Sequence, residues 1–247
     1  MSLSYEERLS DSPYVEKVTR GWTTSQGSTI RPAEVSWHMI LTRHSGGTQF
    51  MLVGPLGTSG VVTWGGEAEI LWIKFKLGVF MPHLPTRDIL ESEQTLPYAS
   101  GKSFWLKGSA WQFPDYDNAD TFIQKLMREE VLAHDPLVES VLQGEPTGMS
   151  PRTVRHRFLR ATGLPQGHIV QFERAQQAAR LLRQGWSILD TVYEAGYFDQ
   201  PHLTRSLKQF IGYTPAQIIR MSGPEFCRSV QDNDPQPEYD VEVLRAI

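Results

Sequence analysis

The chain has 247 residues, 40% of them hydrophobic and 21% charged, which is enough to bury one or two apolar cores. Cys227 is the only cysteine, so an intramolecular disulfide, a cysteine-based zinc site and a CxxC redox pair are excluded. No apolar run approaches the roughly 18 residues that span a bilayer, and no apolar stretch follows a basic start at the N-terminus. We therefore expect a cytoplasmic protein with no membrane partner.

The first half of the chain predicts a β-rich domain. Between residues 35 and 81, segments rich in Val, Ile, Phe, Trp and Thr alternate with glycine-containing turns: "SWHMILTRH", "TQFMLVGPL", "GVVTWG" and "EILWIKFKLGVF". No helical crossover lies between them, so a small antiparallel barrel or sandwich is expected rather than a parallel α/β unit. In the last segment, alternation places Trp72, Lys74 and Lys76 on one face, which we expect to be solvated. Residues 119–132 predict a closing helix, with Phe122, Leu126 and Leu132 on one stripe.

Aromatic residues in this domain suggest a place for a small molecule. Six of the seven tryptophans lie before residue 112, and Trp37, Trp64 and Trp72 are candidates for lining an effector site, although tryptophans also fill β-domain cores. The histidines do not share strand positions with a carboxylate as a metal site requires, so no metal is expected. No P-loop, dinucleotide fingerprint or nucleophile elbow occurs. We expect no cofactor and no enzyme activity.

Charge is divided unevenly along the chain. Residues 149–221 hold ten Lys or Arg and four Asp or Glu, a net charge of +6, whereas residues 222–247 hold two and six, a net charge of −4. The remaining 12 basic and 18 acidic residues give residues 1–148 a net charge of −6. A basic segment within an acidic chain indicates a surface that contacts phosphates, or alternatively a solvated helical face.

Residues 187–217 predict two short helices separated by a glycine turn. Ser187 and Asp190 have the spacing of a capping box, and Gly196 supplies the left-handed residue that ends the first helix. Asp199 or Gln200 caps the second helix, whose first turn tolerates a proline. The second helix turns Leu203, Leu207 and Phe210 inward, ends at Gly212, and is followed by a further cap formed by Thr214, Pro215 and Gln217. Two short helices in this order indicate a helix-turn-helix unit.

The same pattern occurs once more upstream. A shift of 49 positions places Val154 on Leu203, Phe158 on Leu207 and Gly163 on Gly212, and Ser150 with Pro151 forms a cap and first-turn proline. Between the two units, "PQGHIVQFERAQQAARLLRQG" predicts one long helix of about 30 Å, close to the roughly 34 Å between successive major-groove faces of B-DNA. Its inward residues are expected to be Ile169, Phe172, Ala175, Ala179 and Leu182.

Residues 149–218 resemble the DNA-binding domain of the AraC/XylS family of bacterial transcription regulators. The resemblance lies in "MSPRTVRHRF", "TGLP", "ERAQQAARLL" and "SILDTVYEAGYFDQPHLTRSLKQFIGYTP". It implies an α+β protein that regulates transcription by binding operator DNA, with a small-molecule effector, RNA polymerase and a second copy of the chain as further partners. It also implies base contacts by Arg152, Arg155, His156, Gln200, His202 and Arg205, and phosphate contacts by Arg160, Thr204 and Lys208.

The resemblance also implies a division into domains. We predict a β-rich sensor or dimerisation domain in residues 1–130, a double helix-turn-helix domain in residues 131–221 and an acidic tail in residues 222–247. The first domain could instead be a protein-interaction or dimerisation module or a barrel enzyme. The tail is expected to be either disordered or loosely docked, or else to fold onto the basic face and lower nonspecific DNA affinity. The sequence departs from the family pattern at Gly144 and Pro146, where the first scaffold helix is expected, so "DPLVESVLQ" is predicted to act as a displaced scaffold. His156 also stands where the family commonly has arginine.

Overall fold

A computed structural model describes residues 3–222; Cys227 and nearly all of the predicted acidic tail lie outside this range. The chain forms two compact units that interleave along the sequence. The first contains residues 1–27, 34–56 and 64–166, and the second contains residues 28–33 and 57–63 together with the chain from residue 167 onward. The domains predicted from the sequence are contiguous segments instead, and they remain a proposal. Each unit is described by itself.

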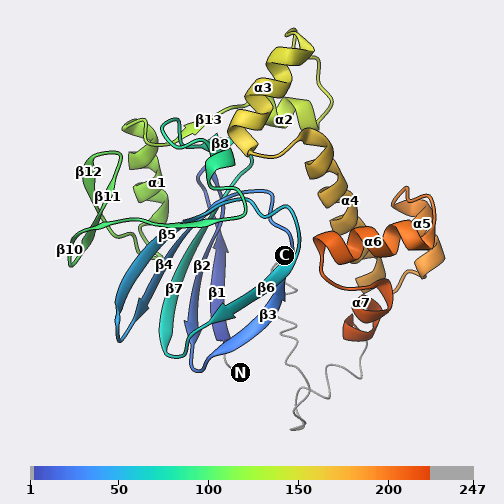
Figure 1. The fold of residues 1–247 in the computed structure, drawn as a ribbon, viewed down its shortest axis with the longest axis horizontal. Coiled ribbons are helices and arrows are strands. Elements are labelled where there is room, and N and C mark those ends of the chain that lie inside the picture. The colour runs from blue at the N-terminus through green and yellow to red at the C-terminus, as the bar shows by residue number, and fades with distance from the viewer. Residues whose placement is uncertain (1–2, 223–247) are drawn as a thin grey trace. The chain divides into compact units, whose positions relative to one another are not determined.

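The fold is β-rich in its N-terminal part and helical in its C-terminal part, as predicted (Figure 1). In chain order the strands and helices are β1 (Leu3–Leu9), β2 (Val15–Thr23), β3 (Gly27–Arg31), β4 (His38–His44), β5 (Gly47–Val53), β6 (Gly60–Trp64), β7 (Ala68–Phe75), β8 (Val79–Phe80), the 3-10 helix η1 (Thr86–Asp88), β9 (Glu93–Thr95), β10 (Tyr98–Ser100), β11 (Ser103–Leu106), β12 (Ser109–Gln112), α1 (Ala119–Arg128), β13 (Ala133–His134), α2 (Leu137–Leu142), α3 (Pro151–Thr162), α4 (Gln166–Arg183), α5 (Ile188–Glu194), α6 (Gln200–Phe210) and α7 (Pro215–Ser222). No helix within residues 3–222 is long and apolar enough to cross a membrane.

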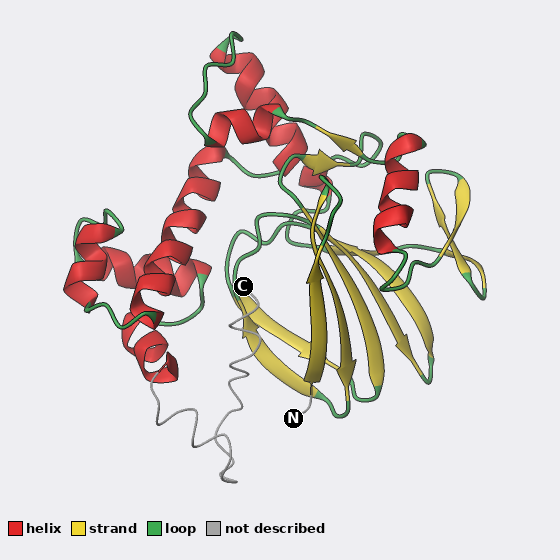
Figure 2. Ribbon diagram, turned by 180° about the vertical axis from the view of Figure 1, so that it is seen from behind, coloured by secondary structure: helices red, strands yellow, loops and turns green. Residues whose placement is uncertain are grey.

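An antiparallel sheet of six strands dominates the first unit. Its strand order is β1-β2-β7-β4-β5-β9, and the strands lie side by side in Figure 2. β1 and β9 are its edges, so the sheet is open. A three-stranded sheet, β10-β11-β12, and the short pair β13-β8 complete the β structure of this unit.

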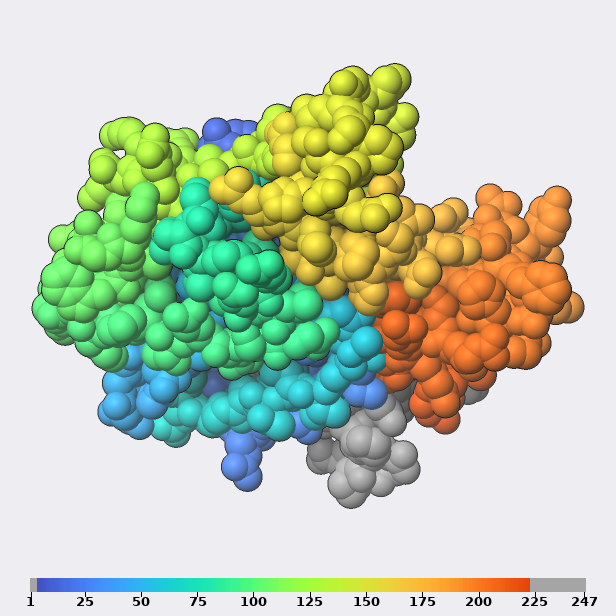
Figure 3. Space-filling model, turned by 45° about the horizontal axis from the view of Figure 1, so that its top comes forward, coloured from blue at the N-terminus to red at the C-terminus, as the bar shows by residue number. Residues whose placement is uncertain are grey.

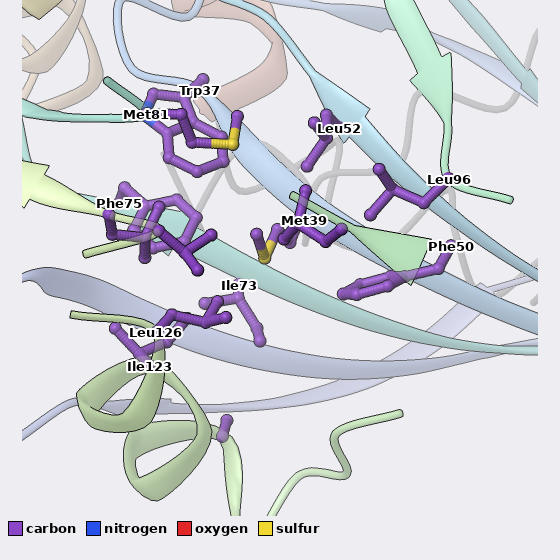
Figure 4. Close-up of a cluster of buried hydrophobic side chains, with 14 of the residues drawn as sticks. Trp37, Met39, Phe50, Leu52, Ile73, Phe75, Met81, Leu96, Ile123 and Leu126 are labelled. Carbon is purple, nitrogen blue, oxygen red and sulfur yellow. The ribbon is translucent and has the colours of Figure 1, made fainter. Parts of the chain in front are cut away.

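One face of the six-stranded sheet carries the core. Side chains from alternate positions of β4, β5 and β7 interdigitate there, and α1 covers them with Ile123 and Leu126 (Figure 4). Trp37 stacks on Phe75 with ring centroids 4.0 Å apart, and its indole nitrogen donates to the Val79 carbonyl at 2.7 Å. The hydrogen bond satisfies the one polar atom of this buried tryptophan, which is the condition for burying it at low cost.

Sequence patterns missed strands β1 to β3 and misjudged the end of α1. In β2, the buried residues Val15 and Val18 are three positions apart, because the register against β7 shifts between Val15 and Lys17. Such a bulge breaks the period of two by which strands are identified. α1 ends at Arg128 rather than residue 132, since Glu130 adopts a left-handed conformation with φ 54°. Leu132 reaches the core from the segment after the helix.

The predicted solvated face of β7 is wrong at one residue. Lys76 is exposed, but the Lys74 side chain is only 14% exposed, and its Nζ lies 3.0 Å from Glu34 Oε1 and 3.1 Å from Glu16 Oε1. Burial alone would lower the pKa of the Lys74 ammonium, but the two carboxylates outweigh it and the pKa is raised. Burial raises the pKa of the Glu34 carboxyl, against the lowering effect of Lys74. Lys74, Glu34 and Glu16 therefore form an ionic cluster on this face of the first unit.

The second unit is built on α4, which buries all five residues that the sequence predicts to face inward. α6 crosses α4 (Figure 1), and the Phe210 ring meets Phe172 and His168 edge-on at 6.2 and 5.2 Å. α7 begins with a reciprocal capping box: Gln217 N donates to Thr214 Oγ1 at 3.2 Å, and Thr214 N donates to Gln217 Oε1 at 2.8 Å. The predicted cap is thus confirmed.

Candidate nucleic-acid interface

The second helix-turn-helix unit, α5 and α6, forms as its caps predict. Ser187 Oγ accepts from the Asp190 amide at 3.1 Å, and Gly196 adopts the left-handed conformation, φ 66°, that ends α5. At the start of α6, Asp199 Oδ1 accepts from the His202 amide at 2.7 Å. Leu203 and Leu207 are fully buried on the inner face of α6. The local sequence therefore fixes where both helices begin and end.

The outer face of α6 is polar and cationic. Gln200, Arg205 and Lys208 are exposed, whereas His202 and Thr204 are half-buried at the sides of this face. The His202 ring packs edge-on against Tyr197 with centroids 5.1 Å apart. Helix α6 thus presents an amide, a guanidinium and an ammonium group to solvent, and these are donors that can address base edges and phosphates.

The turn between α5 and α6 is held by contacts that the sequence did not reveal. Tyr197 Oη lies 2.9 Å from Ser206 Oγ, which ties the turn to α6, and burial raises the pKa of Tyr197. Arg174 of α4 donates from Nη1 to the Gly196 carbonyl at 3.3 Å, and its guanidinium lies 5.3 Å from the centre of the Tyr197 ring. Arg174 lies in the middle of a long helix, and nothing in the neighbouring sequence predicts that it contacts this turn.

The first helix-turn-helix unit pairs α3 with α2, which has only six residues. α2 lies within the "DPLVESVLQ" segment, as predicted, and Gly144 follows it in the left-handed conformation with φ 73°. Ser150 Oγ accepts from the Thr153 amide at 3.2 Å, and Gly163 ends α3 with φ 73°. The predicted cap and stop are confirmed.

Helix α3 is anchored to the β-rich part of its own unit. Arg157 binds the Asp135 carboxylate through two nitrogens, at 2.6 and 3.0 Å, and this pairing raises the pKa of the guanidinium. Thr86 Oγ1 in η1 donates to the Ala161 carbonyl at 3.3 Å. In Figure 3 the yellow surface of α3 adjoins the green-cyan surface of the residues around η1. Helix α3 is therefore part of the first, β-rich unit rather than an independent module.

The residues that the resemblance assigns to DNA on α3 lie at its surface. Arg152, Arg155 and His156 are exposed in its first two turns. Arg160 is exposed nearer the C-terminal end, with its guanidinium 5.2 Å from the centre of the Phe80 ring. Leu159 is also 41% exposed, so the outer face of α3 is less uniformly polar than that of α6.

The three candidate effector tryptophans do not share one surface. Trp37 is buried in the core, and Trp72 stands on the opposite face of the six-stranded sheet, 37% exposed, with its indole nitrogen donating to His38 Nδ1 at 2.6 Å. Trp64 is half-buried, and its indole nitrogen is buried with no hydrogen-bond partner among residues 3–222.

Two of three comparisons with known proteins found matches. Residues 145–221 match the family model of a helix-turn-helix domain. Two crystal structures of ToxT from Vibrio cholerae, one at 1.65 Å resolution in a P21 form and one from strain O395, are similar at 8% and 9% sequence identity. Each comparison covers 90% of this chain and 99% of ToxT, with a TM-score of 0.39. No curated protein matches the sequence.

The capped helix pairs and the exposed donors of α6 define a helix-turn-helix DNA-binding protein. The family match makes this more specific. Residues 145–221 are an AraC-type helix-turn-helix domain, which supports a DNA-binding transcriptional regulator.

Proposed function

We propose that the protein reads a double-stranded operator with both helix-turn-helix units and that a small molecule controls this binding. The observation that carries the proposal is α6, a helix capped by Asp199 whose outer face presents Gln200, Arg205 and Lys208. A major groove admits such a helix, and an arginine can bind guanine O6 and N7 bidentately.

Each exposed residue then has a separate role. Base edges are read by Arg152, Arg155 and His156 on α3 and by Gln200, His202 and Arg205 on α6, whereas Arg160, Thr204 and Lys208 bind phosphates. Phosphate contacts supply affinity that falls with salt, and base contacts supply discrimination. In this proposal the half-buried positions of His202 and Thr204 limit their reach, so Arg205 contributes most to discrimination on α6.

Control of binding belongs to the N-terminal part in this proposal. Residues 1–130 act as the sensor, residues 131–221 bind DNA, and a small molecule that binds one conformation better than another shifts their populations. Operator binding as a homodimer and contact with RNA polymerase complete the proposed regulation.

Footprinting tests whether both units read DNA. On DNA upstream of its own gene, the protein should protect two patches about one helical turn apart, because each recognition helix occupies one major-groove face. With Arg205→Ala, the patch that α6 occupies should be lost while the other persists. Protection of a single patch by the parent protein would show that the first unit, with its six-residue scaffold helix, does not read DNA directly.

Tryptophan fluorescence tests whether the N-terminal part binds a small molecule. Titration with candidate small molecules should reveal one that quenches the emission saturably, and Trp72→Phe should remove this response because Trp72 is partly exposed and bonded to His38. Trp186→Phe, in the helical unit, is the matched control and should retain the response. If no compound quenches but the protein dimerises with rising concentration in sedimentation, the N-terminal part is a dimerisation module instead.

A further inference from the structure

Two short segments of the N-terminal half belong to the second compact unit, which also contains α5 and α6. Residues 28–33 and 57–63 cluster with the chain from residue 167 onward. These two segments, here named the ribbon, contain most of β3 and β6, which pair as a two-stranded sheet (Figure 1).

The ribbon binds the C-terminal end of α6. Ser59 Oγ donates to the Lys208 carbonyl at 2.8 Å, and Ser59 N donates to the Gln209 carbonyl at 2.7 Å. Ala33 N donates to the Phe210 carbonyl at 2.7 Å. The last four carbonyls of an α-helix have no partner within the helix. The carbonyl before these three, at Leu207, accepts from the amides of residues 211 and 212, so the ribbon completes the C-terminal end of α6.

Two further contacts fix the ribbon against the helices. His168 Nε2, on α4, lies 2.9 Å from the Gly57 carbonyl, and its ring meets Phe210 edge-on. Gly212, which ends α6 with φ 90°, lies so close to Ile30 that an added Cβ would come within 2.3 Å of the isoleucine methyl. The ribbon thus contacts the end of α6 in two ways: it donates hydrogen bonds to the last backbone carbonyls, and Ile30 packs against Gly212, where the helix ends.

We propose that the ribbon is a positioning element for base readout by α6 and that Ser59 is a positioning residue. The inference rests on the proposed operator binding. Hydrogen bonds to base edges require a helix held in one orientation, whereas nonspecific attraction to phosphates tolerates small rotations. Residues 24–26 join β2 to β3 and residues 65–67 join β6 to β7, so short segments connect the ribbon along the chain to two strands of the six-stranded sheet.

Variants of Ser59 in the full chain test this role. Ser59→Ala removes the hydroxyl donor to Lys208 and should weaken operator binding roughly 2- to 10-fold, the effect of one lost hydrogen bond. Ser59→Thr keeps a hydroxyl and should bind like the parent. Ser59→Pro removes the amide donor as well and should weaken operator binding further. Thr58→Ala, an exposed hydroxyl next to it, is the matched control and should have no effect.

The decisive quantity is the ratio of operator affinity to random-DNA affinity. A positioning role predicts that this ratio falls in Ser59→Ala and Ser59→Pro, while random-DNA affinity and its salt dependence stay unchanged. Hydrogen exchange gives a second readout without DNA: the amides of residues 211 and 212 should exchange faster in Ser59→Pro, and those of α5 should not.

Three outcomes separate the possibilities. If Arg205→Ala lowers the affinity ratio and the Ser59 variants leave it unchanged, the ribbon inference is overturned and the proposed function stands. If the Ser59 variants lose operator and random-DNA binding equally, the ribbon only stabilises the fold, and the positioning role is again wrong. If the parent protein does not distinguish operator from random DNA, the proposed function fails, and the ribbon inference fails with it.

Discussion

Arg205→Ala should weaken binding to a specific operator by about 1 to 3 kcal/mol, roughly 5- to 150-fold, and should leave binding to random DNA much less affected. Arg205 is exposed on α6 beside the half-buried Thr204, and its guanidinium can form two parallel hydrogen bonds with guanine. Fluorescence anisotropy with operator and random duplexes at several salt concentrations measures both affinities.

Two further arginine substitutions separate base reading from charge. Arg205→Lys keeps the positive charge but loses the planar fork, so it should retain random-DNA affinity and lose most of the discrimination. Arg220→Ala removes the same charge from the exposed surface of α7 and should reduce both affinities slightly and equally. An Arg205→Ala protein that loses the same factor on both duplexes would show that Arg205 contacts only phosphate.

Lys74→Met should destabilise the protein by about 3 to 5 kcal/mol, because it leaves buried carboxylate charge without its counter-ion. Glu34 and Glu16 both face Lys74 within 3.1 Å, Lys17 also acts on Glu34, and His38 Nε2 lies 3.9 Å from Glu34. Urea unfolding followed by tryptophan emission measures the free energy of unfolding. Lys76→Met, which removes an exposed lysine two positions along the chain, should change it little.

The loss in Lys74→Met should also grow with pH. The pKa of Glu34 is already raised by burial, and removal of Lys74 raises it further. A carboxyl with a raised pKa in the folded state binds its proton more tightly there, so stability falls as pH rises from the ordinary glutamate range through the folded pKa. In the parent protein the pKa of Lys74 is raised on folding. The stability that the Lys74 charge contributes is therefore fully present below the ordinary lysine pKa.

A second substitution tests the cause of that pH dependence. Adding Glu34→Gln to Lys74→Met should recover part of the stability and flatten its pH dependence, because the buried charge is then gone. If the double variant is less stable than Lys74→Met at pH 8, the ionic cluster does not act through an uncompensated Glu34, and the explanation is wrong.

The helical elements could be predicted because their signals are local. Ser150, Ser187 and Asp199 each cap a helix by accepting the amide three residues later, so the helix start is encoded within one turn. Gly163 and Gly196 end helices at left-handed positions that other residues rarely adopt. Periodicity then identified the buried faces of α4 and α6.

The β structure was harder to predict where the pattern is irregular. The bulge in β2 puts Val15 and Val18 on the same side with helical spacing, so the strand has no clean alternation. Lys74 stands in regular alternation, but the sequence gives no sign that Glu34 and Glu16 bury it. Side-chain alternation predicts on which face of a strand a residue lies, but it does not predict which other residues cover that face.

The sequence by itself determined the capped helix pairs, the resemblance to AraC-type domains and the outward donors of α6. Only the tertiary structure decided which residues hold α3 and α6 in place: Asp135 binds Arg157 of α3, and the ribbon binds the C-terminal end of α6. The ribbon contacts join Ser59 and Ala33 to carbonyls about 150 and 177 positions away. Two of these three donors are backbone amides. Because every residue except proline carries such an amide, a long-range contact of this kind leaves no mark in the residue types, and only the folded chain reveals it.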